Sequence, residues 1–360
     1  MDFGTVQYID WFRENWRKIA YDMGTSGVHG VTNKQLGIEM GELNLGKTLF
    51  FGHDELIELI SEIYGVEKNG ILITSGSTYA NYLICALHLS PGDEVIVEHP
   101  VYTPLLDVVK LFGTKVRFIE RRFENDYRLD IDELSSMTTK DTRMIVITNL
   151  HNPSGAFMDA GTLKAVADIA EDSHTHVLSD EVYRDFILDD APPVMSSISP
   201  LALSTCSLSK FYGSGALRIG WLMGDSKLIK RARRMNDYLA VTASCAGETY
   251  AAQILAKRDW FVDRVREISA RNYPLVKQWL DKRGDLEAVM PRYGLIVYLR
   301  IIKNIDSMKL AETLLTKYHT ILSPGRFFGE EDHFRIGIGG EKDNLMGAFE
   351  NLGTALDELG

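Results

Sequence analysis

The feature that most constrains this chain is an alternation of short apolar runs with amphipathic helical segments, from about residue 52 to residue 224. Helix-compatible segments such as 81–89 and 162–171 separate most of the apolar runs, which have the length of buried strands. Repeated strand-then-helix order predicts a largely parallel sheet with helices on both faces, and such sheets bind ligands beyond the carboxyl ends of their strands. The predicted strands are 71–73, 94–97, 115–119, 144–147, 176–178 and 221–223.

After about residue 225 the pattern changes to long helices and then to a short mixture of strands and helices. The predicted elements are helices 225–239, 247–256 and 261–282, strand 295–299, helix 307–318, strand 333–338 and helix 344–359. This pattern predicts a smaller α+β domain, against which residues 1–45 pack as an arm. A chain of 360 residues is long enough for two domains. We therefore expect an α/β protein with a large domain over 46–245 and a small domain formed by 1–45 and 246–360.

Composition excludes several classes of partner. The net charge of −11 argues against nucleic acid and anionic membranes, because both would repel the chain. No apolar run approaches the length of a membrane span, and residues 1–5 lack the pattern of a secretory signal. Cys85, Cys206 and Cys245 lie far apart without a Cys-x-x-Cys pair, so we expect reduced core cysteines in a cytoplasmic protein. The glycine pattern of a nicotinamide-binding fold does not follow the first strand.

Lys210 is the strongest candidate for covalent chemistry. It ends the stretch Ser-Leu-Ser-Lys at 207–210, and the small residues around it predict a turn that holds its amine near a carbonyl. Arg218, eight residues further on, offers a planar donor fork that suits a phosphate. Pyridoxal phosphate (PLP) requires both an amine for its aldehyde and an anchor for its phosphate. A surface lysine beside an unrelated arginine is the alternative.

Three further motifs follow predicted strands. Gly76, Ser77 and Thr78 open a helix, whose free N–H groups favour a phosphate, although ordinary capping uses the same residue types. Tyr102 stands where a ligand ring would stack, or else lines the edge of the core. Asn152 precedes a proline, which favours an extended backbone and an amide that can donate to a phenolate oxygen. The Asn-Pro-Ser-Gly sequence is also a common turn.

Asp180 and Tyr183 follow the strand predicted at 176–178, and Arg335 lies in an alternating strand of the last segment. A semi-buried carboxylate at Asp180 can keep a pyridine nitrogen protonated, and Tyr183 can reach the adjacent ring hydroxyl. A metal site is disfavoured, because His174 and His176 lie before or within the strand. A guanidinium in an apolar strand needs an anion, so Arg335 predicts either a carboxylate ligand or a structural salt bridge.

Taken in order, these segments resemble the fold-type I, PLP-dependent aminotransferases of class I/II (the aspartate aminotransferase-like family). The resemblance runs from about residue 21 to the end of the chain. It implies the PLP-dependent transferase fold, pyridoxal 5'-phosphate as cofactor, and a homodimer with its active sites at the subunit boundary. The segments that carry it are Thr-Ser-Gly-Ser-Thr, His-Pro-Val-Tyr, Asn-Pro-Ser-Gly, Ser-Asp-Glu-Val-Tyr, Ser-Leu-Ser-Lys, Leu-Arg-Ile-Gly-Trp and Phe-Arg-Ile-Gly.

The resemblance also implies a role for each candidate residue. Lys210 matches the Schiff-base lysine that shuttles the substrate proton, and Asp180 matches the partner of the pyridinium nitrogen. Tyr183 and Asn152 match the donors to the ring oxygen, and Tyr102 matches the stacking aromatic. The phosphate cup matches Gly76, Ser77, Thr78, Ser207 and Arg218, with Ser209 as a weaker member. The residues expected to bind substrate are Arg335, Asn152 and Ser26.

The sequence departs from the family pattern in two places. Many relatives carry a tyrosine that reaches the partner's phosphate, whereas residues 46–56 contain none, so Lys47 is a candidate replacement. The usual Gly-Glu-Pro-type substrate loop is replaced by residues 22–27, which include Ser26. No arginine is assigned to a second substrate carboxylate, so the side-chain preference stays open.

The resulting hypothesis is transfer of the amino group of an L-amino acid to a 2-oxo acid in two half-reactions. The alternative within the same fold is another PLP-dependent reaction, either a C–S or β-lyase reaction or the cyclisation of an arginine derivative. Residues 236–242 are loosely similar to some cyclising relatives. A non-catalytic, regulator-like binding module is disfavoured, because Lys210 is intact and no helix-turn-helix extension is present.

Overall fold

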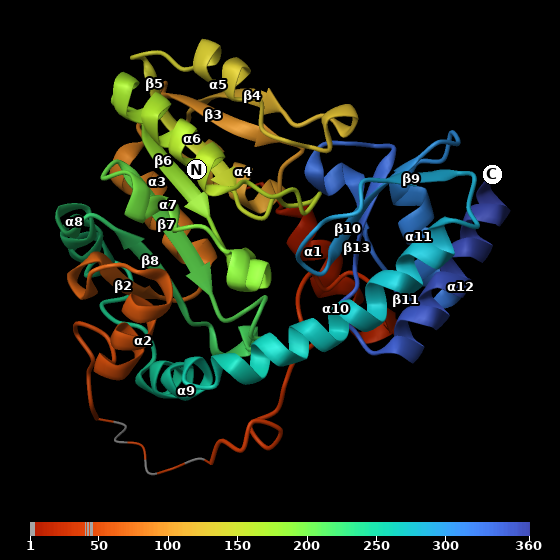
Figure 1. The fold of residues 1–360 in the computed structure, drawn as a ribbon, viewed down its shortest axis with the longest axis horizontal. Coiled ribbons are helices and arrows are strands. Elements are labelled where there is room, and N and C mark those ends of the chain that lie inside the picture. Colours follow the sequence, from red (N-terminus) through yellow and green to blue (C-terminus); the bar gives the residue numbers. More distant parts are fainter. Residues whose placement is uncertain (1–3, 40, 42, 44–45) are drawn as a thin grey trace.

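The computed structural model describes residues 4–39, 41, 43 and 46–360, and its core is built on two sheets of different size (Figure 1). The larger sheet has seven strands in the order β2-β8-β7-β6-β5-β3-β4. Only β8 runs antiparallel to its neighbours, and all other neighbouring pairs are parallel. The strands are β2 (Ile71–Thr74), β3 (Glu94–His99), β4 (Lys115–Glu120), β5 (Thr142–Thr148), β6 (His176–Asp180), β7 (Ala202–Ser207) and β8 (Gly220–Gly224).

Helices cover both faces of the seven-stranded sheet because its central strands are apolar on both sides. On one face α3, α4 and α8 pack on Val95, Val97 and Val146; on the other, α5, α6 and α7 pack on Ile96 and Ile145. Helices α2 and α9 pack at the end where β2 and β8 lie. The helices around the larger sheet are α2 (Asp54–Tyr64), α3 (Ser77–His88), α4 (Thr103–Lys110), α5 (Ile131–Met137), α6 (Ala160–Ser173), α7 (Met195–Ile198), α8 (Ser226–Asn236) and α9 (Cys245–Leu255).

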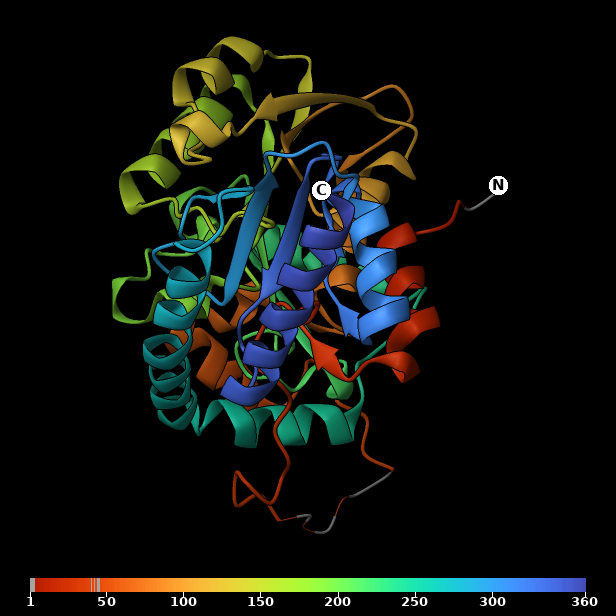
Figure 2. The ribbon, with the colours of Figure 1, turned by 90° about the vertical axis from the view of Figure 1, so that its right-hand side faces the viewer.

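The smaller sheet is antiparallel, with the order β12-β13-β10-β9. Helices α10, α11 and α12 accompany it, and α10 extends from the larger sheet toward the smaller one (Figures 1 and 2). A separate parallel pair joins β1 to β11, which ties the N-terminal segment to this part of the chain. The elements are β1 (Tyr21–Asp22), β9 (Leu286–Ala288), β10 (Ile296–Ile301), β11 (Thr320–Ile321), β12 (Ser323–Pro324), β13 (His333–Gly337), α10 (Arg258–Leu280), α11 (Ser307–Tyr318) and α12 (Lys342–Leu359).

The predicted fold class is confirmed, and the predicted strands and helices overlap the observed ones with small shifts at their ends. The strands that the sequence did not predict are β7 and the short strands β1, β9, β11 and β12, and the N-terminal helix α1 (Gln7–Asn15) was not predicted either. The predicted arm includes residues 1–3, 40, 42 and 44–45, which lie outside the described residues. Cys85 and Cys206 are buried as expected, but Cys245 is only half-buried at the start of α9. Among the described residues, no helix is both long and apolar enough to cross a membrane.

Candidate active site

A cavity of about 430 Å³ lies beyond the carboxyl ends of β5, β6 and β7. It brings together predicted site residues that are far apart in the chain and adds residues from α1, α3 and α4. The predicted residues that line it are Ser77, Thr78, Tyr102, Asn152, Asp180, Tyr183, Ser207, Ser209, Lys210 and Arg218. The lining residues that the sequence did not single out are Ile9, Asn81, Pro104, Leu105, Val108, Thr148, Val182 and Gly215.

One end of the cavity has the properties of a phosphate site. Helix α3 begins directly after Gly76, and the first N–H groups of a helix have no intrahelical acceptor. Gly76 has φ of +85°, and a Cβ at this position would lie 2.6 Å from Nη2 of Arg218. The Arg218 guanidinium is held by the carbonyls of Gly215 and Ser75, at 3.2 and 3.5 Å. The free N–H groups at the start of α3 and the Arg218 guanidinium therefore lie close together, in a space that only a glycine at position 76 leaves open.

Asp180 lies at the end of β6 and is 7% exposed. Burial raises the pKa of its carboxyl, and a hydrogen bond from Asn81 opposes this. Asn81 Nδ2 donates to Asp180 Oδ2 at 2.8 Å, and Asn81 Oδ1 accepts from Thr205 Oγ1 at 2.8 Å. The two hydrogen bonds that link Thr205, Asn81 and Asp180 thus hold in place a buried carboxylate that faces the cavity. A protonated ring nitrogen is the kind of partner that such a carboxylate fits.

Asn81 was not predicted as a site residue, although the sequence contains one signal for it. Asn81 lies on the buried face of α3, among Ala80, Leu83 and Ile84. A buried polar side chain in an apolar helix face needs hydrogen-bond partners, so it indicates a polar neighbour in the fold.

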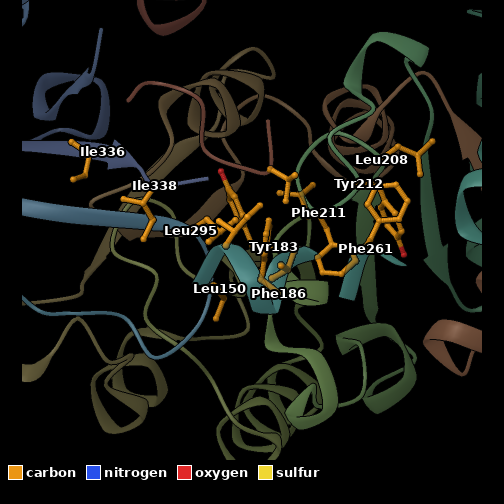
Figure 3. Packing of buried hydrophobic residues seen from close by; sticks show 14 of the residues in the cluster. Leu150, Tyr183, Phe186, Leu208, Phe211, Tyr212, Phe261, Leu295, Ile336 and Ile338 are labelled. Carbon is orange, nitrogen blue, oxygen red and sulfur yellow. The ribbon is translucent and has the colours of Figure 1, made fainter. Parts of the chain in front are cut away.

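The amine of Lys210 lies beside Ser26 and Tyr183. Lys210 Nζ donates to Ser26 Oγ at 3.0 Å, and the hydroxyl of Tyr183 donates to the same oxygen at 2.8 Å. The segment that carries Ser26 is fastened to the lysine loop by Val28 N, which donates to the carbonyl of Lys210 at 2.9 Å. Behind this loop, Figure 3 shows an apolar cluster in which Phe211 and its neighbours pack against Phe261 and Phe186. The Lys210 side chain therefore extends from a tightly packed loop into the cavity.

Arg335 on β13 is fully buried and borders the cavity through Asn152. Its Nη1 donates to Asn152 Oδ1 at 2.7 Å, which leaves the Asn152 amide nitrogen as a donor. Burial lowers the pKa of Arg335, but Tyr8 and Tyr183 outweigh burial, so that its pKa is raised overall. Among the described residues, no carboxylate lies within 4.0 Å of Arg335, so the structural salt bridge considered above is not formed there.

Besides Arg335, two predicted residues lie beside the cavity, and one lies apart from it. Gly76 borders it at the helix start, and Ser26 borders it through Lys210 and Tyr183. Lys47 is exposed on the stretch before α2 and is not among the described residues that line the cavity.

These residues fit a ligand with a phosphate at one end, a basic ring nitrogen at the other and a carbonyl carbon between them. The donors at the start of α3 and Arg218 suit the phosphate, and Asp180 suits the nitrogen. Lys210 supplies the amine for the carbonyl carbon. The fold and this site together define a PLP-dependent enzyme.

The sequence profile of the family described as aminotransferase class I and II matches residues 28–352, and the chain belongs to this family. Its cofactor is pyridoxal 5'-phosphate. The chain is 30% identical over 371 residues to capreomycidine synthase of Streptomyces vinaceus, covering 98% of this chain and 92% of that protein. It is also 30% identical over 316 residues to an aspartate aminotransferase of Pyrococcus horikoshii, covering 84% and 80%. The crystal structure of a PLP-dependent aminotransferase from Streptococcus suis matches with a TM-score of 0.92 at 26% identity, covering 100% of this chain and 99% of that one.

Proposed function

We propose that this enzyme transfers the amino group of an L-amino acid to a 2-oxo acid, with Lys210 as the residue that joins the cofactor covalently. The observation that carries the proposal is that Lys210 and Asp180 line one cavity, which Arg335 borders through its hydrogen bond to Asn152. The three residues come from separate segments. The buried guanidinium has no carboxylate partner among the described residues, as an α-carboxylate site requires.

When bound, PLP supplies an aldehyde carbon that accepts an amino group and a ring that withdraws electrons from the substrate Cα. Lys210 would hold the cofactor through its aldehyde carbon, and its amine would serve as the base for the proton of the substrate Cα. Asp180 would hold a proton on the ring nitrogen. Asn152 would donate to the ring oxygen, and so would Tyr183, whose hydroxyl donates to Ser26 in the structure. Tyr102 would pack on the ring, and Arg335 with Asn152 would orient the substrate through its carboxylate. Ser26 accepts a hydrogen bond from the Lys210 amine and so would position this amine whenever it is free. The phosphate cup consists of Gly76, Ser77, Thr78, Ser207, Ser209 and Arg218.

The direct test mixes the yellow holoenzyme with a panel of amino acids and follows conversion of its absorbance to that of the amino form. We expect conversion with at least one amino acid and its reversal on addition of a 2-oxo acid. Lys210→Ala should abolish turnover, and borohydride should leave a pyridoxyl mass on the wild-type peptide that contains Lys210. Near-normal turnover by Lys210→Ala would refute the lysine assignment.

A second candidate reaction deserves the same assay, because a relative aligned over 98% of the chain is named as a synthase rather than an aminotransferase. The candidate is cyclisation of an arginine derivative. A C–S or β-lyase reaction is a separate alternative that the same assay tests. Pyruvate and ammonia released without any added oxo acid would indicate the lyase. An amino-acid product that retains its nitrogen without any oxo acid would indicate cyclisation.

We further propose that the protein is a cytoplasmic homodimer and that Lys47 contacts the partner's phosphate site. The support for a dimer is a group of exposed apolar side chains near the α8 helix. Phe51 is 74% exposed and Tyr238 is 90% exposed, and exposed apolar side chains that gather in one patch mark interaction surfaces. Lys47 lies on the same stretch as Phe51.

A further inference from the structure

We propose that Tyr8 of α1 is a substrate-binding residue whose hydroxyl donates to the α-carboxylate held by Arg335. This inference rests on the proposed function, because it concerns the same carboxylate site. It assigns a role to the N-terminal helix beyond packing, and it adds a neutral donor to a clamp that otherwise consists of Arg335 and Asn152.

The hydrogen bonds of Arg335 define where a carboxylate can bind. Nη1 donates to Asn152 and Nη2 donates to the hydroxyl of Tyr8 at 2.8 Å. Nη2 also lies 3.3 Å from the carbonyl of Gly24 and 3.2 Å from Ser323 Oγ. Asn152 and Tyr8 therefore flank the edge of the guanidinium that carries both terminal nitrogens. A carboxylate that approaches this edge arrives beside the phenol.

The Tyr8 hydroxyl is suited to meet an anion at this point. Its oxygen accepts from Arg335, and a hydroxyl that accepts a hydrogen bond still has its own proton to donate. The side chain is 7% exposed, so a hydrogen bond to a carboxylate would form away from bulk water. Burial raises the pKa of Tyr8, but Arg335 and Lys210 outweigh burial, so that its pKa is lowered overall. The same positive charges would attract the substrate anion.

Packing holds the phenol in place. The Tyr8 ring meets Tyr102 edge to face at a centroid distance of 4.9 Å, and Phe12 and Phe327 lie at 5.1 and 5.8 Å. Helix α1 is fastened by Trp11, whose Nε1 donates to the carbonyl of Leu322 at 3.3 Å. Ile9, the next residue after Tyr8, lines the cavity. Tyr8 thus lies between the aromatic expected to stack on the cofactor and the arginine expected to bind the substrate.

The test compares Tyr8→Phe, which keeps the ring and removes the hydroxyl, with Tyr127→Phe as a matched control. Tyr127 is buried in the same aromatic cluster, and its hydroxyl bonds to His333 at 3.1 Å. Propionate, which has the carboxylate but no amine, is titrated into each PLP-loaded protein by calorimetry. We expect Tyr8→Phe to weaken propionate binding by roughly tenfold, as for a lost hydrogen bond to a charged group. The KM for the amino acid should rise by a similar factor, while kcat changes by less than about threefold.

Each outcome bears on the inference. Unchanged propionate binding and KM in Tyr8→Phe would overturn it, and so would an equal loss in Tyr127→Phe, because general packing would then explain both. Rescue is tested with Tyr8→His, which restores a donor in a ring, and partial recovery of propionate binding relative to Tyr8→Phe is expected. Because propionate binding needs no turnover, a wild-type enzyme that proves to be a cyclase or lyase would refute the proposed amino transfer while leaving this inference standing.

Discussion

At the scale of single residues, the candidate site is supported by polar groups buried behind it rather than by surface charges. Asp180 is held by Asn81, and Asn152 N donates to Thr148 Oγ1 at 3.1 Å. Thr148 in turn donates to the carboxylate of Glu98. Glu98 and Arg121 form an ion pair at 2.8 Å, and both side chains are fully buried. The contacts expected to hold the cofactor and the substrate therefore depend on buried hydrogen bonds one layer further from the cavity.

The first prediction concerns Asn81. In Asn81→Ala, Asp180 loses the donor that opposes the effect of burial, so its pKa should rise further and its ionised form should become less available to a ring nitrogen. We expect kcat to fall by about tenfold, the effect of one lost hydrogen bond to a charged group. Steady-state kinetics on PLP-loaded protein measure this. Asn351→Ala removes an amide bonded to Thr320, on the far side of the smaller sheet, and should leave kcat unchanged. Equal kcat values for wild type and Asn81→Ala would disprove the role.

The second prediction concerns the buried pair of Glu98 and Arg121. Burial raises the pKa of Glu98, and Arg121 opposes this. Glu98→Gln leaves the Arg121 charge buried and unpaired, so we expect a loss of about 3–5 kcal/mol in unfolding free energy. The double variant Glu98→Gln/Arg121→Met removes both charges and should recover much of that loss. Thermal unfolding of all four members of the cycle gives the coupling. Additive effects of the two single changes would contradict the prediction.

At the scale of elements, the sequence predicted six strands of the seven-stranded sheet and missed β7, in which several side chains carry hydroxyl groups. β7 (Ala202–Ser207) is buried throughout, yet it contains Ser204, Thr205 and Ser207. Their hydroxyls bond to partners elsewhere in the chain, such as Glu181 for Ser204 at 2.7 Å. Local pattern cannot reveal such partners, because only the fold brings them together. The missing strand joins β6 to β8 and carries Ser207 to the cavity.

Helix α1 was missed for a different reason. Its apolar residues Tyr8, Trp11 and Phe12 follow helical spacing, which is a detectable signal. The glycines further along residues 1–45 led to the expectation of an irregular arm. Motif matching also passed over Tyr8, because its position beside Arg335 depends on the pairing of β1 with β11 and on the packing of α1.

Residues such as Tyr102, Asn152, Asp180 and Lys210 could be expected to lie together, because each ends or follows a strand at the same edge of the larger sheet. Arg335 lies within β13 of the smaller sheet, so only the fold brings it to them.

The third prediction concerns the contact between α2 and α9. Glu248 on α9 accepts a hydrogen bond from His53 N, just before α2, at 2.7 Å. Burial raises the pKa of Glu248 from 4.5 to about 7, and the hydrogen bond from His53 and the charge of Arg233 oppose burial. The folded protein therefore binds this proton more tightly than the unfolded chain does. The stability that this proton supplies is present below about pH 4.5 and is lost as the pH rises through about 7, a change of roughly 3 kcal/mol.

Glu248→Gln isolates this effect, because glutamine keeps the acceptor and does not titrate. We expect the midpoint of thermal unfolding of the wild type to fall relative to that of Glu248→Gln between about pH 5 and about pH 8. Other buried carboxyls titrate equally in both proteins, so the difference between the two curves reports on Glu248 alone. A constant difference over this range would contradict the prediction.

At the scale of the whole molecule, the two sheets provide different parts of the candidate site. The seven-stranded sheet contributes Asp180, and Lys210 follows β7, whereas Arg335 comes from the smaller sheet. The N-terminal segment joins them, because its Ser26 accepts a hydrogen bond from Lys210 and its Tyr8 accepts one from Arg335. The division into domains over 46–245 and over 1–45 with 246–360 stays a prediction, and it agrees with this separation of the sheets. A relative movement of the two parts would change the distance between the expected cofactor and substrate contacts.

The last prediction concerns assembly. Phe51 lies under the guanidinium of Arg233, with the guanidinium carbon 5.2 Å from the ring centroid, and the carbonyl of Phe50 accepts from the same arginine at 3.2 Å. Phe50 is 63% exposed and Leu239 is 52% exposed. We expect the wild type to have a mass of twice 40.5 kDa by light scattering, because a second copy would cover these side chains. A monomer mass over the whole concentration range would disprove the homodimer.

Substitutions on the exposed stretch locate the contact. Phe51→Glu places a charge among the apolar side chains, where it would be buried without a partner in a dimer, so dissociation should occur at much higher protein concentration than in the wild type. Ile302→Glu is the control, since Ile302 is also exposed, at 54%, but lies after β10 on the smaller sheet. If Lys47 reaches the partner's phosphate site, Phe51→Glu should also weaken PLP binding, and Lys47→Met should weaken it while the dimer stays intact. Loss of the dimer in Ile302→Glu, with Phe51→Glu unaffected, would place the interface elsewhere.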